Sequence, residues 1–227
     1  MKTSRLLIGL AALVPFTATA SLGATSSIGP TGLLTVPTAE VVPMDTTEAM
    51  VAYDSLRVAD EKIKVFPIAN LEYGFKDGEV GATYFSIKGQ TDVKALNAKY
   101  LFKTGNAKSP AIAVGVIYLK GNSAETDLYL VATQRLGEKN NVRATAGVMY
   151  QKPSGVSGSN TTAMFGLEFG KPGKTTIGLD YVVKDIAAGK LYGAILRQPI
   201  AKNLTGQIAV GNNSRFFAGL TLQFGGK

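Results

Sequence analysis

The feature that most constrains this chain is a repeated alternation of apolar residues with polar or small ones, which begins at Thr46 and continues to Phe224. The alternation comes in segments of about ten residues, each bounded by Gly, Asn, Asp, Lys or Pro, which is the pattern of β-strands and not of helices. It is clearest from Ile63 to Phe75 and from Phe216 to Phe224, where every second residue is apolar. Each predicted strand therefore has one apolar face and one mostly polar face.

Twelve such segments can be counted, with a margin of ten to fourteen, because the parity is blurred in two of them, at residues 79–88 and 126–136. A bulge or a misplaced boundary would explain the blurring. The predicted strands cover residues 46–55, 62–75, 79–88, 92–103, 111–120, 126–136, 141–151, 161–170, 174–184, 190–199, 203–211 and 215–224. An even set of antiparallel strands predicts an all-β fold, an up-and-down transmembrane β-barrel.

The connections between these segments are expected to alternate in length. Compact turns such as residues 76–78 are followed by longer stretches such as residues 152–161. Barrels of the bacterial outer membrane have short periplasmic turns and longer outer loops. We therefore expect the chain to enter the barrel from the periplasmic side.

The N-terminus has the three-part layout of a secretory signal. Lys2 and Arg5 precede an apolar run, and a small-residue stretch ending at Ala20 follows it. This layout predicts cleavage after residue 20, with an alternative end at residue 24. We therefore divide the chain into a signal peptide over residues 1–20, a Pro- and Gly-containing segment over residues 21–45, and a barrel over residues 46–227.

Alternation alone does not say whether the apolar face lines a soluble core or meets lipid, so a secreted soluble β-barrel is the alternative. The aromatic residues favour the membrane, because they gather at two heights along the predicted strands. One girdle comprises Tyr53, Tyr84, Tyr118, Tyr150, Tyr181 and Tyr192, and the other comprises Phe75, Phe102, Phe169 and Phe224. Aromatic rings at two heights are typical of side chains that lie among the headgroups at both membrane interfaces. We predict the bacterial outer membrane as the location and its lipid as a partner.

The opposite faces of the strands predict a polar lumen. The interior of an eight-stranded barrel is narrow enough for side chains alone to fill it. A twelve-stranded barrel encloses a wider lumen, which has room for polar side chains and water. The charged residues predicted to line it are Glu72, Lys99, Arg135, Arg143, Glu168, Asp180, Lys184, Arg197 and Arg215. Opposite charges on adjacent strands, such as Arg143 and Glu168, are expected to pair. The lining is either a salt-bridged interior or a pore that favours anions weakly.

Composition excludes several classes of function. The chain contains no histidine and no cysteine, which removes the usual general base, the commonest metal ligand and thiolate chemistry. We therefore expect no enzymatic activity, no cofactor and no metal site. The net charge of +8 is spread along the sequence. Nucleic-acid binding, which requires clustered basic residues, is not expected.

The stretch before the first strand contains Gly29, Pro30, Gly32 and Pro37. Its prolines remove hydrogen-bond donors, so the stretch is not predicted to be a membrane strand. The sequence from residue 29 to residue 39 resembles the G-x-T-G-L-x-x-x-P-T-A segment near the mature start of YjbH-like outer-membrane proteins. The resemblance is closest over residues 28–75. The chain is shorter than the large multi-part members of that group and lacks their lipoprotein cysteine.

The resemblance to YjbH-like proteins implies a link to exopolysaccharide export, with polysaccharide or envelope proteins as partners. The first functional hypothesis is a narrow, porin-like channel or envelope component, with residues 21–45 plugging the lumen or contacting the rim. The alternative is a structural or adhesion barrel whose loops, above all residues 152–161, bind a partner at the cell surface.

Overall fold

The computed structural model describes residues 24–58, 61–137, 141–155, 157–171, 173–186 and 188–226. The predicted signal peptide over residues 1–20 lies outside this part of the chain. Among the described residues, no helix is long and apolar enough to cross a bilayer. The regular elements are strands, because the two-residue period of the sequence continues almost without interruption after Thr46.

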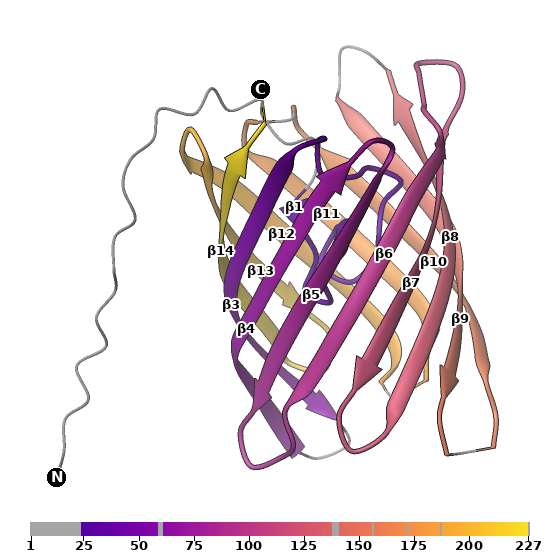
Figure 1. The fold of residues 1–227 in the computed structure, drawn as a ribbon, viewed down its shortest axis with the longest axis vertical. Helices are drawn as coiled ribbons and strands as arrows, with labels where there is room; N and C mark the ends of the chain where they lie inside the picture. The colour runs from indigo at the N-terminus through magenta and orange to yellow at the C-terminus, as the bar shows by residue number, and fades with distance from the viewer. Residues whose placement is uncertain are drawn as a thin grey trace, which may run out of the picture.

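Strands β3 to β14 form one closed antiparallel barrel, in which sequence neighbours are also spatial neighbours and β14 closes against β3 (Figure 1). Their bounds are β3 Thr46–Val58, β4 Glu61–Phe75, β5 Gly78–Ile87, β6 Val93–Lys103, β7 Ala111–Lys120, β8 Ala124–Leu136, β9 Val142–Pro153, β10 Asn160–Phe169, β11 Thr176–Asp185, β12 Gly189–Ala201, β13 Leu204–Gly211 and β14 Arg215–Gly225. The prediction of a twelve-stranded up-and-down barrel is confirmed.

The two segments with blurred parity have different explanations. The register between β4 and β5 shifts between Val65 and Ile68, next to the blurred part of β5. By contrast, β8 pairs with both of its neighbours without interruption. Tyr129 and Val131 of β8 face the interior, where they are 2% and 1% exposed. The predicted irregularity in β8 is therefore wrong, because these apolar residues belong to the inner face.

The two ends of the barrel have connections of similar length. We call the end where β3 begins the near end and the end where β3 finishes the far end. Near-end connections comprise residues 76–77, 104–110, 137–141, 170–175 and 202–203, and far-end connections comprise 59–60, 88–92, 121–123, 154–159, 186–188 and 212–214. The expected alternation of short and long connections is wrong, because β9 and β10 extend into the predicted long loop and shorten it to residues 154–159.

The outer wall of the barrel is apolar. Leu96, Val148 and Leu179 are 61%, 50% and 44% exposed on strand faces that point away from the lumen. The side chains of the two predicted aromatic girdles are all exposed or half-buried. The tyrosines lie toward the far end of their strands, and the four phenylalanines lie at the near end. This exterior is suited to hydrocarbon between two interfaces.

The strand faces that point into the lumen were predicted to be mostly polar, but they also carry many apolar side chains. Met50, Ile68, Ile117 and Phe217 are at most 1% exposed and belong to two apolar clusters inside the barrel. These clusters include Leu34 and Val36, which precede β3 in the sequence. The interior therefore has partners for apolar side chains that a water-filled lumen would not provide.

Candidate functional site

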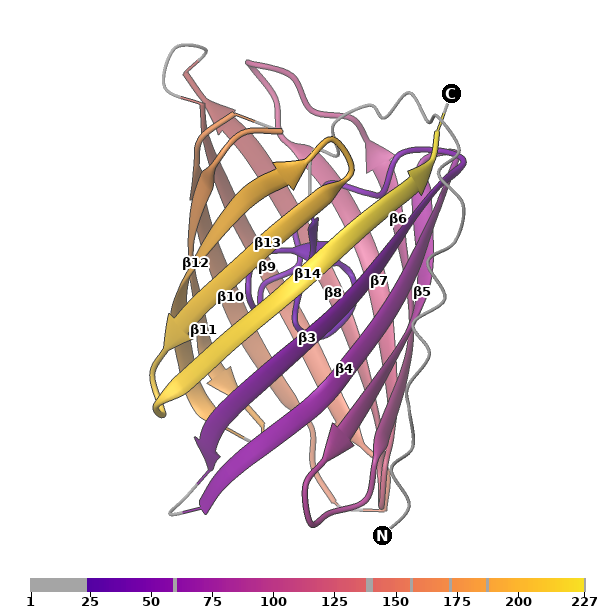
Figure 2. The ribbon, with the colours of Figure 1, turned by 90° about the vertical axis from the view of Figure 1, so that its left-hand side faces the viewer.

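The candidate site is the barrel lumen together with the N-terminal segment that occupies it. Residues 24–42 run inside the wall, and residues 43–45 lead to the start of β3 at the near end, as the indigo trace in Figures 1 and 2 shows. The segment forms a short hairpin from β1 (Ala24–Thr25) and β2 (Thr31–Gly32). Every residue from 29 to 39 except Thr35 is buried. This segment is not part of the hydrogen-bonded wall, yet it fills much of the barrel interior.

Glycines give the segment its compact path. Gly29 has a φ of 123°, a backbone conformation that favours glycine. A Cβ atom on Gly32 would lie 2.8 Å from the Cα atom of Pro37, so only a glycine fits there without a shift. The amide of Leu33 donates to the carbonyl of Val36 at 2.9 Å. The motif residues noted in the sequence therefore build a tight double turn.

An ion pair between β5 and β6 holds the middle of the segment. The Glu79 carboxylate accepts hydrogen bonds from the amides of Thr31 and Val42, at 2.9 and 2.8 Å. Lys99 Nζ lies 3.0 Å from Glu79 Oε1 and donates to the carbonyl of Thr31 at 2.8 Å. Both charged side chains are inaccessible to solvent. Buried charges persist only when they are paired and hydrogen-bonded, as these are.

A second set of charged side chains holds the turn between residues 32 and 36. Arg197 on β12 donates to the carbonyl of Gly32 at 2.5 Å. Asp180 on β11 accepts from the amides of Thr35 and Val36, at 2.5 and 3.2 Å. These contacts give hydrogen-bond partners to peptide groups of the buried segment. The wall therefore holds the segment mainly through its peptide groups.

Two further arginines complete the network. Arg143 on β9 pairs with Glu168 on β10 and with Glu40 of the segment. Arg215 on β14 pairs with Asp54 at 2.6 Å and donates to Ser27 and Thr35 of the segment, at 2.7 and 2.8 Å. Burial raises the pKa of the Glu40 carboxyl above its ordinary value, and the Arg143 guanidinium opposes this effect.

Wall glycines accommodate the apolar side chains of the segment. A Cβ atom on Gly178 would lie 2.8 Å from Leu33 Cδ2, and one on Gly193 would lie 2.8 Å from Leu34 Cδ2. Both leucines are 1% exposed. Glycine on the inner wall therefore provides hollows for Leu33 and Leu34, and a larger residue there would collide with the segment.

Seven of the nine predicted lumen-lining charges belong to this interior. Glu72, Lys99, Arg143, Glu168, Asp180 and Arg197 are buried, and Arg215 is half-buried. Arg135 and Lys184 are exposed, at the near end of β8 and the far end of β11 respectively. Sequence reasoning missed Glu79 and Glu40. Glu79 falls at the edge of the strand with blurred parity, but its register position opposite Lys99 would have indicated its role.

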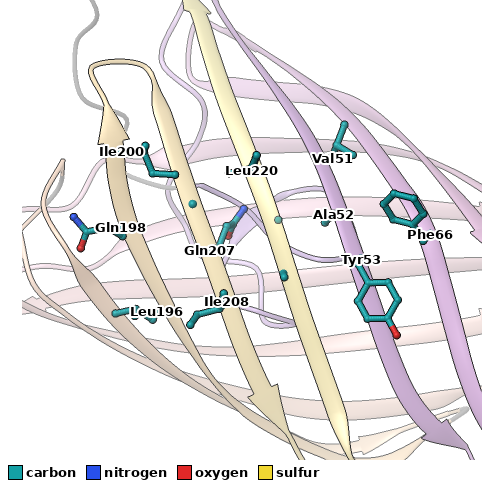
Figure 3. Close-up of a pocket in the computed structure, with 13 residues that line it drawn as sticks. Val51, Ala52, Tyr53, Phe66, Leu196, Gln198, Ile200, Gln207, Ile208 and Leu220 are labelled. Atoms are coloured by element: carbon teal, nitrogen blue, oxygen red, sulfur yellow. The ribbon is translucent and has the colours of Figure 1, made fainter. Parts of the chain in front are cut away.

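A cavity with charged groups in its lining adjoins the segment at the near end. It has a volume of about 420 Å³, and its lining includes Glu40, Thr133, Arg135, Arg143 and the connection at residues 104–107. A different hollow, of about 540 Å³, lies on the outer wall and is lined by residues such as Val51, Phe66 and Ile208 (Figure 3). No charged residue lines this outer hollow. Of these two hollows, the near-end cavity is the one that offers charged groups to a ligand.

Solved structures with a similar fold include porins and an outer-membrane channel. The KdgM porin is 14% identical, with a TM-score of 0.65 over 78% of this chain and 99% of the porin. A structure of that porin in complex with disordered oligogalacturonate gives a TM-score of 0.63 at 14% identity, over 79% of this chain and 99% of the porin. An outer-membrane channel from Pseudomonas putida F1 is 13% identical, with a TM-score of 0.60 over 82% and 98% of the two chains. The fold is that of a porin-like β-barrel of the bacterial outer membrane.

The family is shown by sequence. The family model YjbH, described as exopolysaccharide biosynthesis protein YbjH, matches residues 24–169, which include the luminal segment and strands β3 to β10. The chain belongs to this family. No curated protein sequence matches it. The resemblance noted over residues 28–75 is therefore confirmed, and the match extends well beyond it.

Proposed function

We propose that this protein is a non-enzymatic channel of the outer membrane that serves exopolysaccharide export and is closed by its own residues 24–45. The observation that carries the proposal is the placement of this segment inside the barrel, where charged side chains from the wall bind its backbone. A barrel that served only as a scaffold would have no need of a segment bound in this way.

The chemistry of these contacts supports a removable plug. Peptide groups of the segment accept from Lys99 and Arg197 and donate to Glu79 and Asp180. Water or sugar hydroxyl groups could make the same hydrogen bonds if the segment left. Among the described residues, the buried Tyr129 Oη has no hydrogen-bond partner in the protein, which also suits a lumen that admits hydroxyl groups. The segment can therefore be exchanged for a polar ligand without leaving charges bare.

The expected substrate class is an acidic polysaccharide. Arg197 and Arg215 both donate to the segment and would face the lumen if it moved. Arginine binds carboxylates through two parallel hydrogen bonds, so uronate groups would suit these positions. The fold is shared with a porin whose structure was solved with oligogalacturonate, which is a polymer of this class.

The non-enzymatic role rests on the side chains that are present. The chain has no histidine or cysteine. Among the luminal carboxylates, Glu79, Asp180 and Glu168 are engaged with the segment or with arginines. Glu72 is buried and accepts hydrogen bonds from Asn70 and Asn97. A general base requires a carboxylate that can reach a substrate. Transport or structural support therefore remains as the role of the lumen.

Deleting residues 26–42 tests the plug. In planar bilayers, the shortened chain should show a larger single-channel conductance than the full chain. Oligogalacturonate should block the current more strongly than a neutral oligosaccharide of equal length. The migration of unboiled and boiled samples on a gel provides the control for an intact barrel. Equal currents from two intact barrels would reject the plug and favour a structural or adhesion barrel.

A further inference from the structure

The outer wall carries basic residues next to the far-end aromatic residues. Lys94, Lys120 and Lys152 are exposed, and each lies two residues from an exposed apolar side chain of the outer face, namely Leu96, Tyr118 and Tyr150 respectively. Residues two apart on a strand share a face, so these lysines point outward too. They lie about 7 Å farther along the strand than their apolar neighbours.

These lysines form part of an arc that follows neighbouring strands. Lys64 lies two residues from Phe66 on β4, and the amide of Lys88, just after β5, donates to the carbonyl of Lys64 at 3.1 Å. We define the lysine arc as Lys64, Lys88, Lys94, Lys120 and Lys152, which lie at the far ends of β4, β5, β6, β7 and β9. All five side chains are exposed.

The near end also carries exposed basic residues, among them Lys76, Lys103, Lys171 and Lys202, but they are placed differently. Two residues beyond the last aromatic residues of β4, β6 and β14 stand Asp77, Thr104 and Gly226, and only β10 has a lysine there, Lys171. The two interfaces of the barrel therefore differ in where their basic residues stand relative to the aromatic residues. Because loop lengths are similar at both ends, this placement is the feature that distinguishes the two ends of the barrel.

Two members of the arc face each other directly. Lys94 and Lys120 are register partners across β6 and β7. Among the residues that the structure describes, neither takes part in an ion pair. Like charges directly opposite each other destabilise a sheet unless an anion lies between them. The pair therefore points to a bound anion at this place on the wall.

The nearby acidic residue does not neutralise the arc. Asp92 lies in the connection after β5 and accepts a hydrogen bond from the Tyr84 hydroxyl. This hydrogen bond, more than the charge of Lys94, holds the pKa of the Asp92 carboxyl below its ordinary value. Among the described residues, the exposed carboxylates at the far ends of these strands are Glu61 and Asp92, so five ammonium groups still leave a net positive arc.

We infer that the lysine arc binds the phosphate groups of the glycolipid that forms the outer leaflet of the bacterial outer membrane. The arc lies just beyond the far-end aromatic girdle, where headgroups are expected. Lysine is an effective phosphate ligand, and a basic cluster at a membrane surface attracts anionic lipid. The far end of the barrel therefore faces the cell exterior. This inference rests on the membrane location and not on the proposed channel.

The test uses purified full-length protein in detergent with diphosphoryl lipid A or with the same lipid after dephosphorylation. The temperature at which the folded band disappears on a gel measures stability. Only the phosphorylated lipid should raise this temperature appreciably, and the midpoint of its titration gives the affinity. Neutralising Lys94 and Lys120 should weaken that affinity by roughly tenfold or more.

The double variant K94Q/K120Q has a matched control in K76Q/K171Q, which removes two exposed near-end lysines. Without lipid A, K94Q/K120Q should be at least as stable as the original chain, because the opposed charges are gone. With diphosphoryl lipid A, K94Q/K120Q should be less stable than the original chain. The inference is overturned if both lipids stabilise equally or if the control variant loses as much affinity. Stronger stabilisation by polygalacturonate than by lipid A would also overturn it.

Discussion

At the scale of single residues, the interior depends on charges that each serve several partners. Glu79 accepts from two amides of the N-terminal segment and also pairs with Lys99. Replacing one member of a buried pair leaves the other charge without compensation, whereas replacing both removes the problem. The stability lost on replacing one member of a buried ion pair thus depends more on the charge that remains unpaired than on the contact that is lost.

Replacing Lys99 with Met should therefore lower the free energy of unfolding by about 3 to 5 kcal/mol, because it strands the Glu79 carboxylate in the interior. Adding Glu79→Gln should restore part of this loss. Unfolding in urea, followed by the gel shift of the folded barrel, measures the free energy of unfolding of Lys99→Met, of Glu79→Gln and of the double variant. Lys103→Met, at the exposed end of the same strand, is the control and should change little. A double variant that loses the sum of both single losses would contradict this account.

At the scale of strands, the sequence predicted the bounds of all twelve barrel strands within three residues. A two-residue period is a strong signal when one face meets lipid and the other does not. The face of β8 was harder to assign, since Tyr129 and Val131 are apolar yet point inward. An apolar residue is compatible with either face here, because the luminal segment gives the interior its own apolar partners. The predicted connection lengths were also wrong, because β9 and β10 continue into the loop that was predicted over residues 152–161.

The middle of β11 provides the sharpest test of face assignment. Leu179 is exposed on the outer wall, and an arginine there should destabilise the barrel by about 2 to 4 kcal/mol, as expected for a charge near the middle of the bilayer. Leu179→Met is the matched control. Urea unfolding in lipid vesicles gives the difference. Gly178 on the inner face is unsuitable for comparison, because Leu33 lies against it. Equal stability of the two Leu179 variants would show that this position does not face hydrocarbon.

At the scale of the whole molecule, a closed hydrogen-bonded wall should resist detergent until it is heated. We expect the protein to sediment with the outer membrane and to migrate differently on a gel before and after boiling. Recovery from the soluble periplasmic fraction without detergent would contradict the membrane assignment and support a secreted barrel.

The filled lumen could be predicted only in part. Strand parity identified Lys99, Asp180 and Arg197 as inward charges, and the prolines and glycines of residues 29–37 argued against a wall strand. The contacts that join them, such as Lys99 with Thr31, connect residues 68 positions apart and leave no periodic signal in the sequence. A two-residue period describes neighbours within a sheet, so it carries no information about a segment that lies across the sheet's inner face.

Introduced cysteines can locate the segment in the intact membrane, because the chain has no cysteine of its own. Val36 is fully buried in the lumen, whereas Met44, near the end of the same segment, is 58% exposed. A membrane-impermeant maleimide applied to opened outer-membrane vesicles should label Met44→Cys quickly and Val36→Cys at least about tenfold more slowly, since labelling of a buried site requires local opening. Mass spectrometry of the whole protein measures both rates.

The labelling rates also separate a fixed plug from a removable one. If the segment leaves when an acidic polymer enters, oligogalacturonate should speed the labelling of Val36→Cys and leave that of Met44→Cys unchanged. The reason is thermodynamic: a ligand that binds only the open lumen raises the population of that state in proportion to its concentration over its dissociation constant. Slow labelling of Val36→Cys at every polymer concentration would indicate that the segment stays in place and that this polymer does not open the channel. Fast labelling without any polymer would contradict a segment bound in the lumen.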